Sequence, residues 1–150
     1  MARWAVAANK GAANVQGVLY LTAASANMRR AKVYDWTLGC GASPGDAAFI
    51  HIGQRCTTAA TGSAKTPNSL DPADTLATTI VAQDTITVDG TLTANAFVFR
   101  KALNQRATFR WVAAPYSEIL IPATANNGVM LGLSSASTTT FDYDALYEEY

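Results

Sequence analysis

Hydrophobic and polar positions alternate along much of this chain, which is the period of a half-buried β-strand and not of a helix. The clearest case is the segment 138–147, whose apolar positions are Phe141, Tyr143, Ala145 and Tyr147. In the segment 30–38, Tyr34, Trp36 and Leu38 share one predicted face. Further β-prone runs, separated by turn-forming residues, cover 18–22, 49–58, 97–99, 107–112, 118–121 and 129–133.

A Thr-rich run of alternating residues is interrupted by Asp89-Gly90, a pair that is typical of a tight hairpin turn. A two-residue hairpin would place Leu92 on the wrong face of the sheet. One continuous strand that bends at the glycine keeps Ile86, Val88 and Leu92 on the same face. We therefore predict a single long bent strand over 84–94.

One local pattern predicts a helix. Asp71 can cap a helix start, Pro72 suits the first helical position, and Asp74 places a carboxylate where the helix dipole favours it. The pattern predicts one short helix at about 71–77. The small and polar residues of 59–69 predict a loop before it.

About nine or ten short strands with regularly spaced turns are typical of a sandwich or a barrel. The expected fold class is all-β, a jelly-roll-like antiparallel β-sandwich with one short helix near 71–77. Residues 9–14 have no periodic apolar pattern, and residues 1–17 are predicted to be an extended N-terminal arm with at most a short strand. Residues 18–150 then form a single β-sandwich domain, a size that can bury roughly 70% of the unfolded surface.

Composition favours a protein that contacts other proteins. Only 15% of the residues are charged, whereas globular proteins average about 25%. Much of the surface must therefore be small and weakly hydrated, which suits packing against a partner. Formal net charge is zero and the only basic cluster is Arg29, Arg30 and Lys32, so nothing predicts nucleic-acid binding. No secretory signal and no membrane span is predicted, which fits assembly in a cytoplasm.

Residues that could carry catalysis do not converge in the sequence. The single histidine, His51, alternates on a predicted strand with Arg55, while Ile50 and Ile52 occupy the other face. No nucleophile elbow, phosphate-binding glycine loop or zinc-protease motif is present. We therefore interpret His51 as a surface or subunit-contact residue, and predict no catalytic residue and no enzyme activity.

Metal and cofactor sites are likewise not predicted. Cys40 and Cys56 lack the spacing of a zinc site and are interpreted as two small, buried or half-buried thiols, although a disulfide between neighbouring strands stays open. Asp142 and Asp144 lie on one face of a strand near the glutamates 148 and 149. An acidic strand edge that blocks unwanted pairing explains them better than calcium binding.

The aromatic side chains have two interpretations. Trp4, Trp36, Trp111, Tyr116 and the C-terminal tyrosines could together form a sugar-binding platform. Most of them alternate along predicted strands, which favours packing in the core or at an interface.

Several segments in this order resemble a group of small virion proteins of tailed bacteriophages. They are LDPAD at 70–74, the Thr-rich bent strand, LNQRATFRWVAAP at 103–115 and IPATANNG at 121–128. The resemblance covers about residues 29–147 and is more specific in the second half. The chain departs from it at two turn positions, with Ser117 where glycine is usual and Gly90 in place of proline.

The resemblance implies a jelly-roll-like capsid decoration (cement) protein that binds the shell of major capsid protein and stabilises it. Such a subunit sits on the capsid exterior of the virion and usually forms homo-oligomers, often trimers. It needs no cofactor, metal, nucleic acid or membrane. The arm is then the candidate capsid contact, through Arg3, Trp4 and Lys10, and the loops 39–47 and 59–70 are candidates for contacts with the shell or between subunits.

Two other classes stay open. A carbohydrate- or receptor-binding β-sandwich module of a phage tail or fibre predicts exposed aromatic side chains in one groove. A hydrolase predicts a polar pocket around His51.

Overall fold

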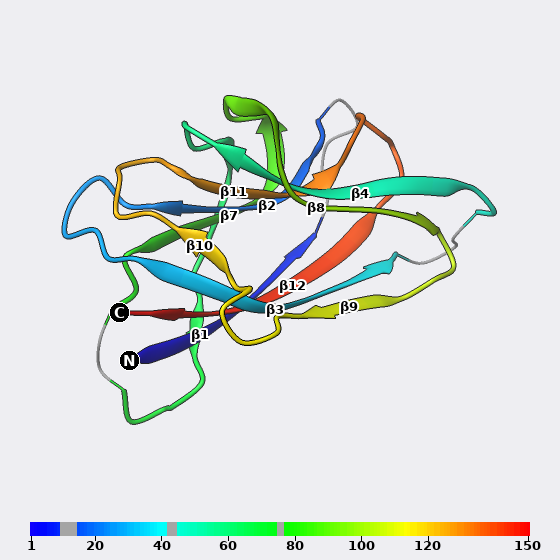
Figure 1. Cartoon of the computed structure of the whole chain (residues 1–150). Coiled ribbons are helices and arrows are strands. Elements are labelled where there is room, and N and C mark those ends of the chain that lie inside the picture. Colours follow the sequence, from blue (N-terminus) through cyan, green and yellow to red (C-terminus); the bar gives the residue numbers. More distant parts are fainter. Residues whose placement is uncertain (10–14, 42–44, 75–76) are drawn as a thin grey trace.

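The computed structural model describes residues 1–9, 15–41, 45–74 and 77–150. Two six-stranded antiparallel sheets pack face to face as a β-sandwich, as Figure 1 shows. The described residues contain no α-helix. The expected all-β sandwich is therefore confirmed at the level of architecture.

Sheet A is the lower layer of Figure 1, and its strands run in the order β10-β3-β12-β1-β6, with β9 also pairing with β3. The bounds are β1 Ala2–Asn9, β3 Ala31–Cys40, β6 Asn68–Ser69, β9 Phe109–Val112, β10 Ile119–Ile121 and β12 Phe141–Glu149. β9 and β10 pair with successive parts of β3 and together form one interrupted edge of the sheet.

Sheet B is the other layer, and its strands run in the order β5-β7-β2-β11-β4-β8. The bounds are β2 Gly17–Ala23, β4 Ala48–Cys56, β5 Thr61–Lys65, β7 Ile80–Val88, β8 Leu92–Asn104 and β11 Gly128–Leu133. The strands β2 and β11 lie at the centre of the sheet and are buried on both faces.

Residues 2–9 form strand β1 of sheet A, which is longer than the short strand that the arm prediction allowed. β1 pairs with β12 along its whole length, and Trp4 lies opposite Tyr147 in the ladder. Ala2, Trp4, Val6 and Ala8 alternate inward and are buried. Two of the inward residues are alanines, and Ala5 and Ala7 face the other way, so the alternation is weak in the sequence. Residues 10–14 lie outside the described part.

The last strand has the predicted alternation, and the third strand departs from it at one residue. Phe141, Tyr143, Ala145 and Tyr147 are all buried against sheet B. In β3 a register shift skips Tyr34, because Leu146 faces Asp35 while Tyr147 already faces Val33. This β-bulge turns Val33 and Trp36 into the core, whereas strict alternation had grouped Tyr34 with Trp36.

The segment 84–94 is neither a hairpin nor a single strand. β7 and β8 do not pair with each other and lie toward opposite sides of sheet B. Gly90 crosses close to the backbone of Thr58 and Ala59, which lies between β4 and β5. Rejecting the hairpin was correct, but the strand is interrupted at residues 89–91.

This crossing covers the face of sheet B that points away from sheet A. A second, smaller hydrophobic cluster forms beneath it. Its members come from β2, β4, β7, β11 and the segments around them, and are Val15, Tyr20, Ile52, Cys56, Ala60, Ile86 and Met130, with Ile50 and Leu92 packed against them. The main cluster fills the space between the two sheets.

Two further predictions are corrected between β4 and β7. The predicted loop 59–69 contains the short strands β5 and β6. The predicted helix start is a turn: the Asp71 side chain accepts from the Ala73 N–H at 2.9 Å, and its carbonyl accepts from the Asp74 N–H at 3.0 Å. The capping chemistry was interpreted correctly, but residues 77–79 have no helical structure, and 75–76 lie outside the described part.

Candidate functional site

His51 is a core residue, so its interpretation as a surface or subunit-contact residue is wrong. Its side chain is 1% exposed and packs edge-on against the Phe141 ring, with centroids 4.9 Å apart. Both faces of β4 are covered, one by sheet A and one by the β7–β8 crossing. The histidine therefore has no route to a substrate on the surface of the folded chain.

The hydrogen bonds of His51 fix its protonation. The Tyr143 hydroxyl donates to the Gly132 carbonyl oxygen at 3.1 Å, so it accepts from His51 Nδ1 at 2.6 Å. Among the described residues, Nε2 has no hydrogen-bond partner. Burial lowers the pKa of His51 to about 4, because a charged imidazole would lose its hydration there. The residue is neutral at pH 7 and serves packing.

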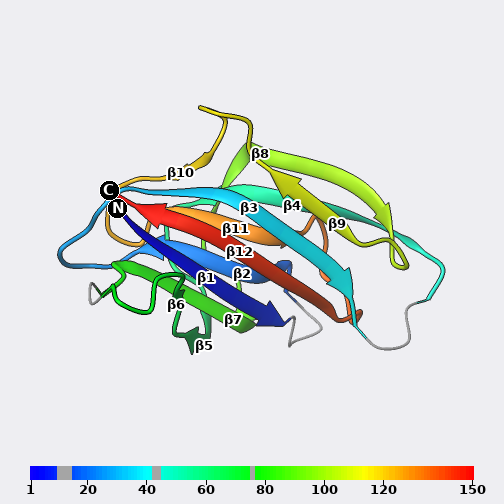
Figure 2. The same ribbon diagram turned by 90° about the horizontal axis from the view of Figure 1, so that it is seen from below.

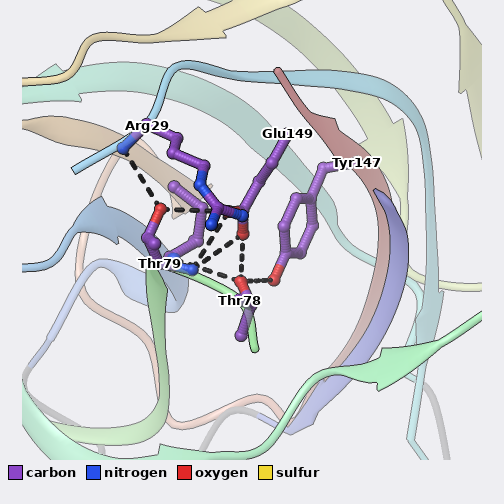
Figure 3. Close-up of polar contacts among 6 residues, drawn as sticks. Arg29, Thr78, Thr79, Tyr147 and Glu149 are labelled. Atoms are coloured by element: carbon purple, nitrogen blue, oxygen red, sulfur yellow. Dashed lines mark hydrogen bonds and ion pairs between the residues drawn. The ribbon is translucent and has the colours of Figure 1, made fainter. Parts of the chain in front are cut away.

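The most highly connected buried carboxylate is Glu149, which was interpreted as part of an acidic edge. It is 2% exposed. Figure 3 shows it accepting hydrogen bonds from the Thr78 hydroxyl, from the Thr79 N–H at 3.0 Å and from the Thr79 hydroxyl at 3.0 Å. Arg29 lies 3.9 Å away as a partly exposed ion-pair partner. The cluster ties β12 of sheet A to the start of β7 in sheet B.

The Tyr147 hydroxyl extends this cluster through Thr78, at 2.9 Å. Burial raises the pKa of Tyr147 well above its usual range. The phenol is neutral and contributes a hydrogen bond, which makes the cluster a structural latch and not a proton-transfer site. Asp142 and Asp144 are the exposed acidic residues of this strand, and since β12 is central in sheet A they do not form a strand edge.

A half-buried carboxylate, that of Asp89, organises the entry to β2. Asp89 accepts from two consecutive backbone N–H groups, those of Gln16 at 2.7 Å and Gly17 at 2.9 Å. It also accepts from the Tyr20 hydroxyl at 3.1 Å. These bonds fix the chain where it leaves β7 for the crossing, so this carboxylate too has a structural explanation.

The cysteines are free thiols, with Cys40 half-buried and Cys56 buried, as the sequence predicted. Burial raises the pKa of Cys56 to about 11. Within the part of the chain that the structure describes, no group of three or more His, Cys, Asp or Glu residues is placed to hold a metal ion.

The aromatic residues do not gather into a platform. Trp4 and Trp36 are 6% and 1% exposed and belong to the core, which confirms the packing interpretation for both. Of the candidate capsid contacts, Trp4 is therefore not available to a partner, Arg3 is exposed, and Lys10 lies outside the described residues. A role for Arg3 in binding stays a prediction.

Exposed hydrophobic side chains are found along one side of the sandwich, where β8 ends sheet B and β9 and β10 end sheet A. We call this side the β8–β10 edge. Its exposed apolar residues are Phe97, Val98, Val112, Tyr116 and Leu120. Phe99 and Phe109 meet between the two sheets here, with centroids 5.5 Å apart. Residues 92–121 contain four basic residues and one acidic residue, Glu118, and Arg110 is paired with Asp35. The edge is therefore apolar with a small excess of positive charge.

Tyr116 is the most unusual residue of this edge. It is 99% exposed and has a backbone φ of 68°. The Ser117 N–H donates to the Ala114 carbonyl oxygen at 2.9 Å, which closes a turn with Pro115 and Tyr116 at its tip. The left-handed conformation costs a non-glycine residue about 1–2 kcal/mol. Figure 2 shows the loop between β9 and β10 projecting beyond the sheets.

A groove of about 430 Å³ opens beside the same edge, between β10 and the ends of β4 and β8. Its lining includes the apolar residues Ala96, Leu120, Ile121 and Pro122 and the cations Arg30 and Arg55. The Arg55 guanidinium is half-buried and donates to the Leu120 carbonyl oxygen. Burial lowers the pKa of Arg55 from its usual value. This groove could not be predicted from the sequence, because its lining residues come from five separate segments.

Compared with models of protein families, with curated proteins and with solved structures, the chain matches none of them. No helix among the described residues is long and apolar enough to cross a membrane.

Proposed function

We propose that this chain is a non-enzymatic structural protein of a bacteriophage virion, a capsid decoration (cement) subunit that binds the major capsid protein and stabilises the shell. The observation that carries the proposal is the β8–β10 edge, where exposed apolar side chains lie among basic ones. An exposed strand edge with apolar residues favours contact with another protein. The phage assignment itself rests on the sequence resemblance.

The arrangement of ionisable groups supports a role without catalysis. His51, Glu149 and Asp89 are each explained by hydrogen bonds inside the fold. The proposed mechanism is therefore mass action: each subunit that binds only the assembled shell adds interface and stabilises the assembly. An interface of roughly 1,600 Å² suffices for specific attachment, and repetition around the shell adds avidity.

The proposal includes a jelly-roll-like connectivity, a position on the capsid exterior and association into homo-oligomers. The β8–β10 edge is the part of the described surface that best suits a shell with an acidic face, because Arg100 and Lys101 lie on β8 without a nearby carboxylate in sequence. A tail or fibre module that binds glycans is less well supported, since the tryptophans that would form its platform are largely buried.

Cryo-electron microscopy of the particle that carries this protein tests the proposal. We expect density for many copies over the shell lattice. Density confined to the tail or to one vertex would contradict decoration and favour receptor binding, and absence from the particle would reject a virion role.

A matched pair of variants then locates the contact. We expect Arg100→Ala/Lys101→Ala to lower occupancy on the shell more than Arg3→Ala does, since Arg3 is a single exposed cation on β1. The reverse result would place the shell contact at β1 and not at the β8–β10 edge.

A further inference from the structure

The ring of Tyr116 is almost completely exposed and does not pack against the rest of the fold. Tyr116 projects from the turn between β9 and β10, almost completely exposed, on a backbone conformation that glycine adopts more easily. Its side chain makes no hydrogen bond that stabilises the turn, which is closed by the main chain of Ala114 and Ser117. A large ring in this position has no role in stabilising the monomer and is available to a second molecule.

The groove beside it contains two arginines whose charge is not balanced by a carboxylate among its described lining residues. Arg30 and Arg55 line the groove, and none of its lining residues is a carboxylate. The remaining wall is formed by small and apolar residues that include Ala96, Leu120 and Pro122. A tyrosine ring complements such a surface, because its face attracts a guanidinium and its edge packs on apolar groups. The volume of about 430 Å³ is larger than a tyrosine side chain.

We propose that the groove of one copy receives Tyr116 of a second copy, so that the chain associates with itself through the β9–β10 loop and the groove. Arg100 and Lys101 of β8, which are proposed to contact a shell, do not line this groove. Leu120 lines the groove only four residues after Tyr116. The ring and the groove are thus neighbours on one edge, and two copies exchange them reciprocally across a two-fold axis. The proposal rests on the self-association part of the proposed function and not on attachment to a shell.

Sedimentation velocity of the purified chain tests this exchange. At about 1 to 100 µM we expect a species of twice the 15.8 kDa chain mass. Tyr116→Ala should weaken association about thirtyfold, the effect of an interface hot spot. Tyr116→Phe should retain most of it, because the ring is kept. Ala96→Trp should weaken it equally by filling the groove, and Val88→Ala, which alters an exposed residue of β7, should leave it unchanged.

The folded state of Tyr116→Ala is checked by its thermal melting, which we expect to be close to wild type because the side chain is exposed. A photo-crosslinking aromatic residue at position 116 then reports the contact directly, and we expect crosslinks to peptides that contain Arg55 or Leu120 of the other copy. A wild-type chain that is monomeric throughout, a Tyr116→Ala variant that associates normally, or crosslinks elsewhere would each overturn the inference. Shell binding by a monomer would leave the decoration proposal intact, so the two failures are distinguishable.

Discussion

Removing the Glu149 carboxylate tests whether the latch between the two sheets is a main source of stability. In Glu149→Ala, the Thr79 N–H and the hydroxyls of Thr78 and Thr79 lose their shared acceptor in a largely buried site (Figure 3). Breaking a buried charged network by removing one partner costs about 3–5 kcal/mol. Most of this is the cost of leaving donors unpaired, about 1–3 kcal/mol each and not fully additive.

The expected loss in the free energy of unfolding is therefore about 4 kcal/mol for Glu149→Ala. Urea denaturation followed by tryptophan fluorescence measures it, and with a slope of about 2 kcal/mol per molar the midpoint falls by about 2 M. Glu149→Gln should lose less, since the amide oxygen still accepts from one donor while the amide nitrogen faces another.

Glu148→Ala is the matched control, because the neighbouring glutamate points to the other face of β12 and is partly exposed. Its removal should cost less than about 1 kcal/mol, as for a surface charge. If Glu149→Ala and Glu148→Ala unfolded at the same urea concentration, the structural assignment of the latch would be refuted.

Four further outcomes are expected. The pKa of His51 is lowered to about 4 in the fold, against about 6.5 in the unfolded chain. Because the unfolded state binds more protons between these pH values, stability falls by up to about 3 kcal/mol as the pH is lowered from 7 to 4. A His51→Phe variant with the same pH profile would contradict this. Gly128→Ala should lose about 3 kcal/mol by calorimetry, because an added Cβ would overlap a main-chain carbonyl oxygen of β2; an unchanged melting temperature would disprove the overlap. Thiol labelling should modify Cys40 first and Cys56 only on unfolding, and equal rates would show that the second core is open. Deleting residues 2–9 should abolish cooperative unfolding, and a normally folded product would restore the arm interpretation.

The strands that carry large residues at every second position were predictable from the sequence. β12 is the best example, because Phe141, Tyr143 and Tyr147 leave no other period possible. β1 was missed because two of its four inward residues, Ala2 and Ala8, are alanines, whose burial gives a weak pattern. Glu149 could have been found, since it continues the inward positions of β12, but its charge suggested the surface.

Other features depend on contacts between distant segments. His51 faces sheet A and packs against Phe141 of β12. The crossing between β7 and β8 covers the opposite face of β4, where Ile50 and Ile52 lie. Because both faces of β4 are buried, alternation alone could not show that the histidine belongs to the core. The bulge at Tyr34 depends on the register with β12. The helix expected at 71–77 did not form, although Asp71 makes the expected capping hydrogen bond with the Ala73 N–H. A capping residue stabilises an isolated turn as well as a helix start, so the capping pattern alone does not predict that a helix follows.

The candidate surface was least predictable. Its exposed side chains come from segments that individually resemble ordinary strands. The groove exists only because β10, the end of β4 and the start of β8 meet in space. The low overall charge did indicate that part of the surface suits protein contact, without indicating which part.

The place of β12 between β1 and β3 has a consequence for biosynthesis. β12 follows the other eleven described strands in the sequence, yet it pairs with both of its neighbours in the middle of sheet A. While the ribosome is still translating the preceding residues, β1 and β3 have no partner between them, and the inner face of sheet B stays uncovered. Folding must therefore wait for release of this segment, and nascent chains need protection from aggregation until it arrives.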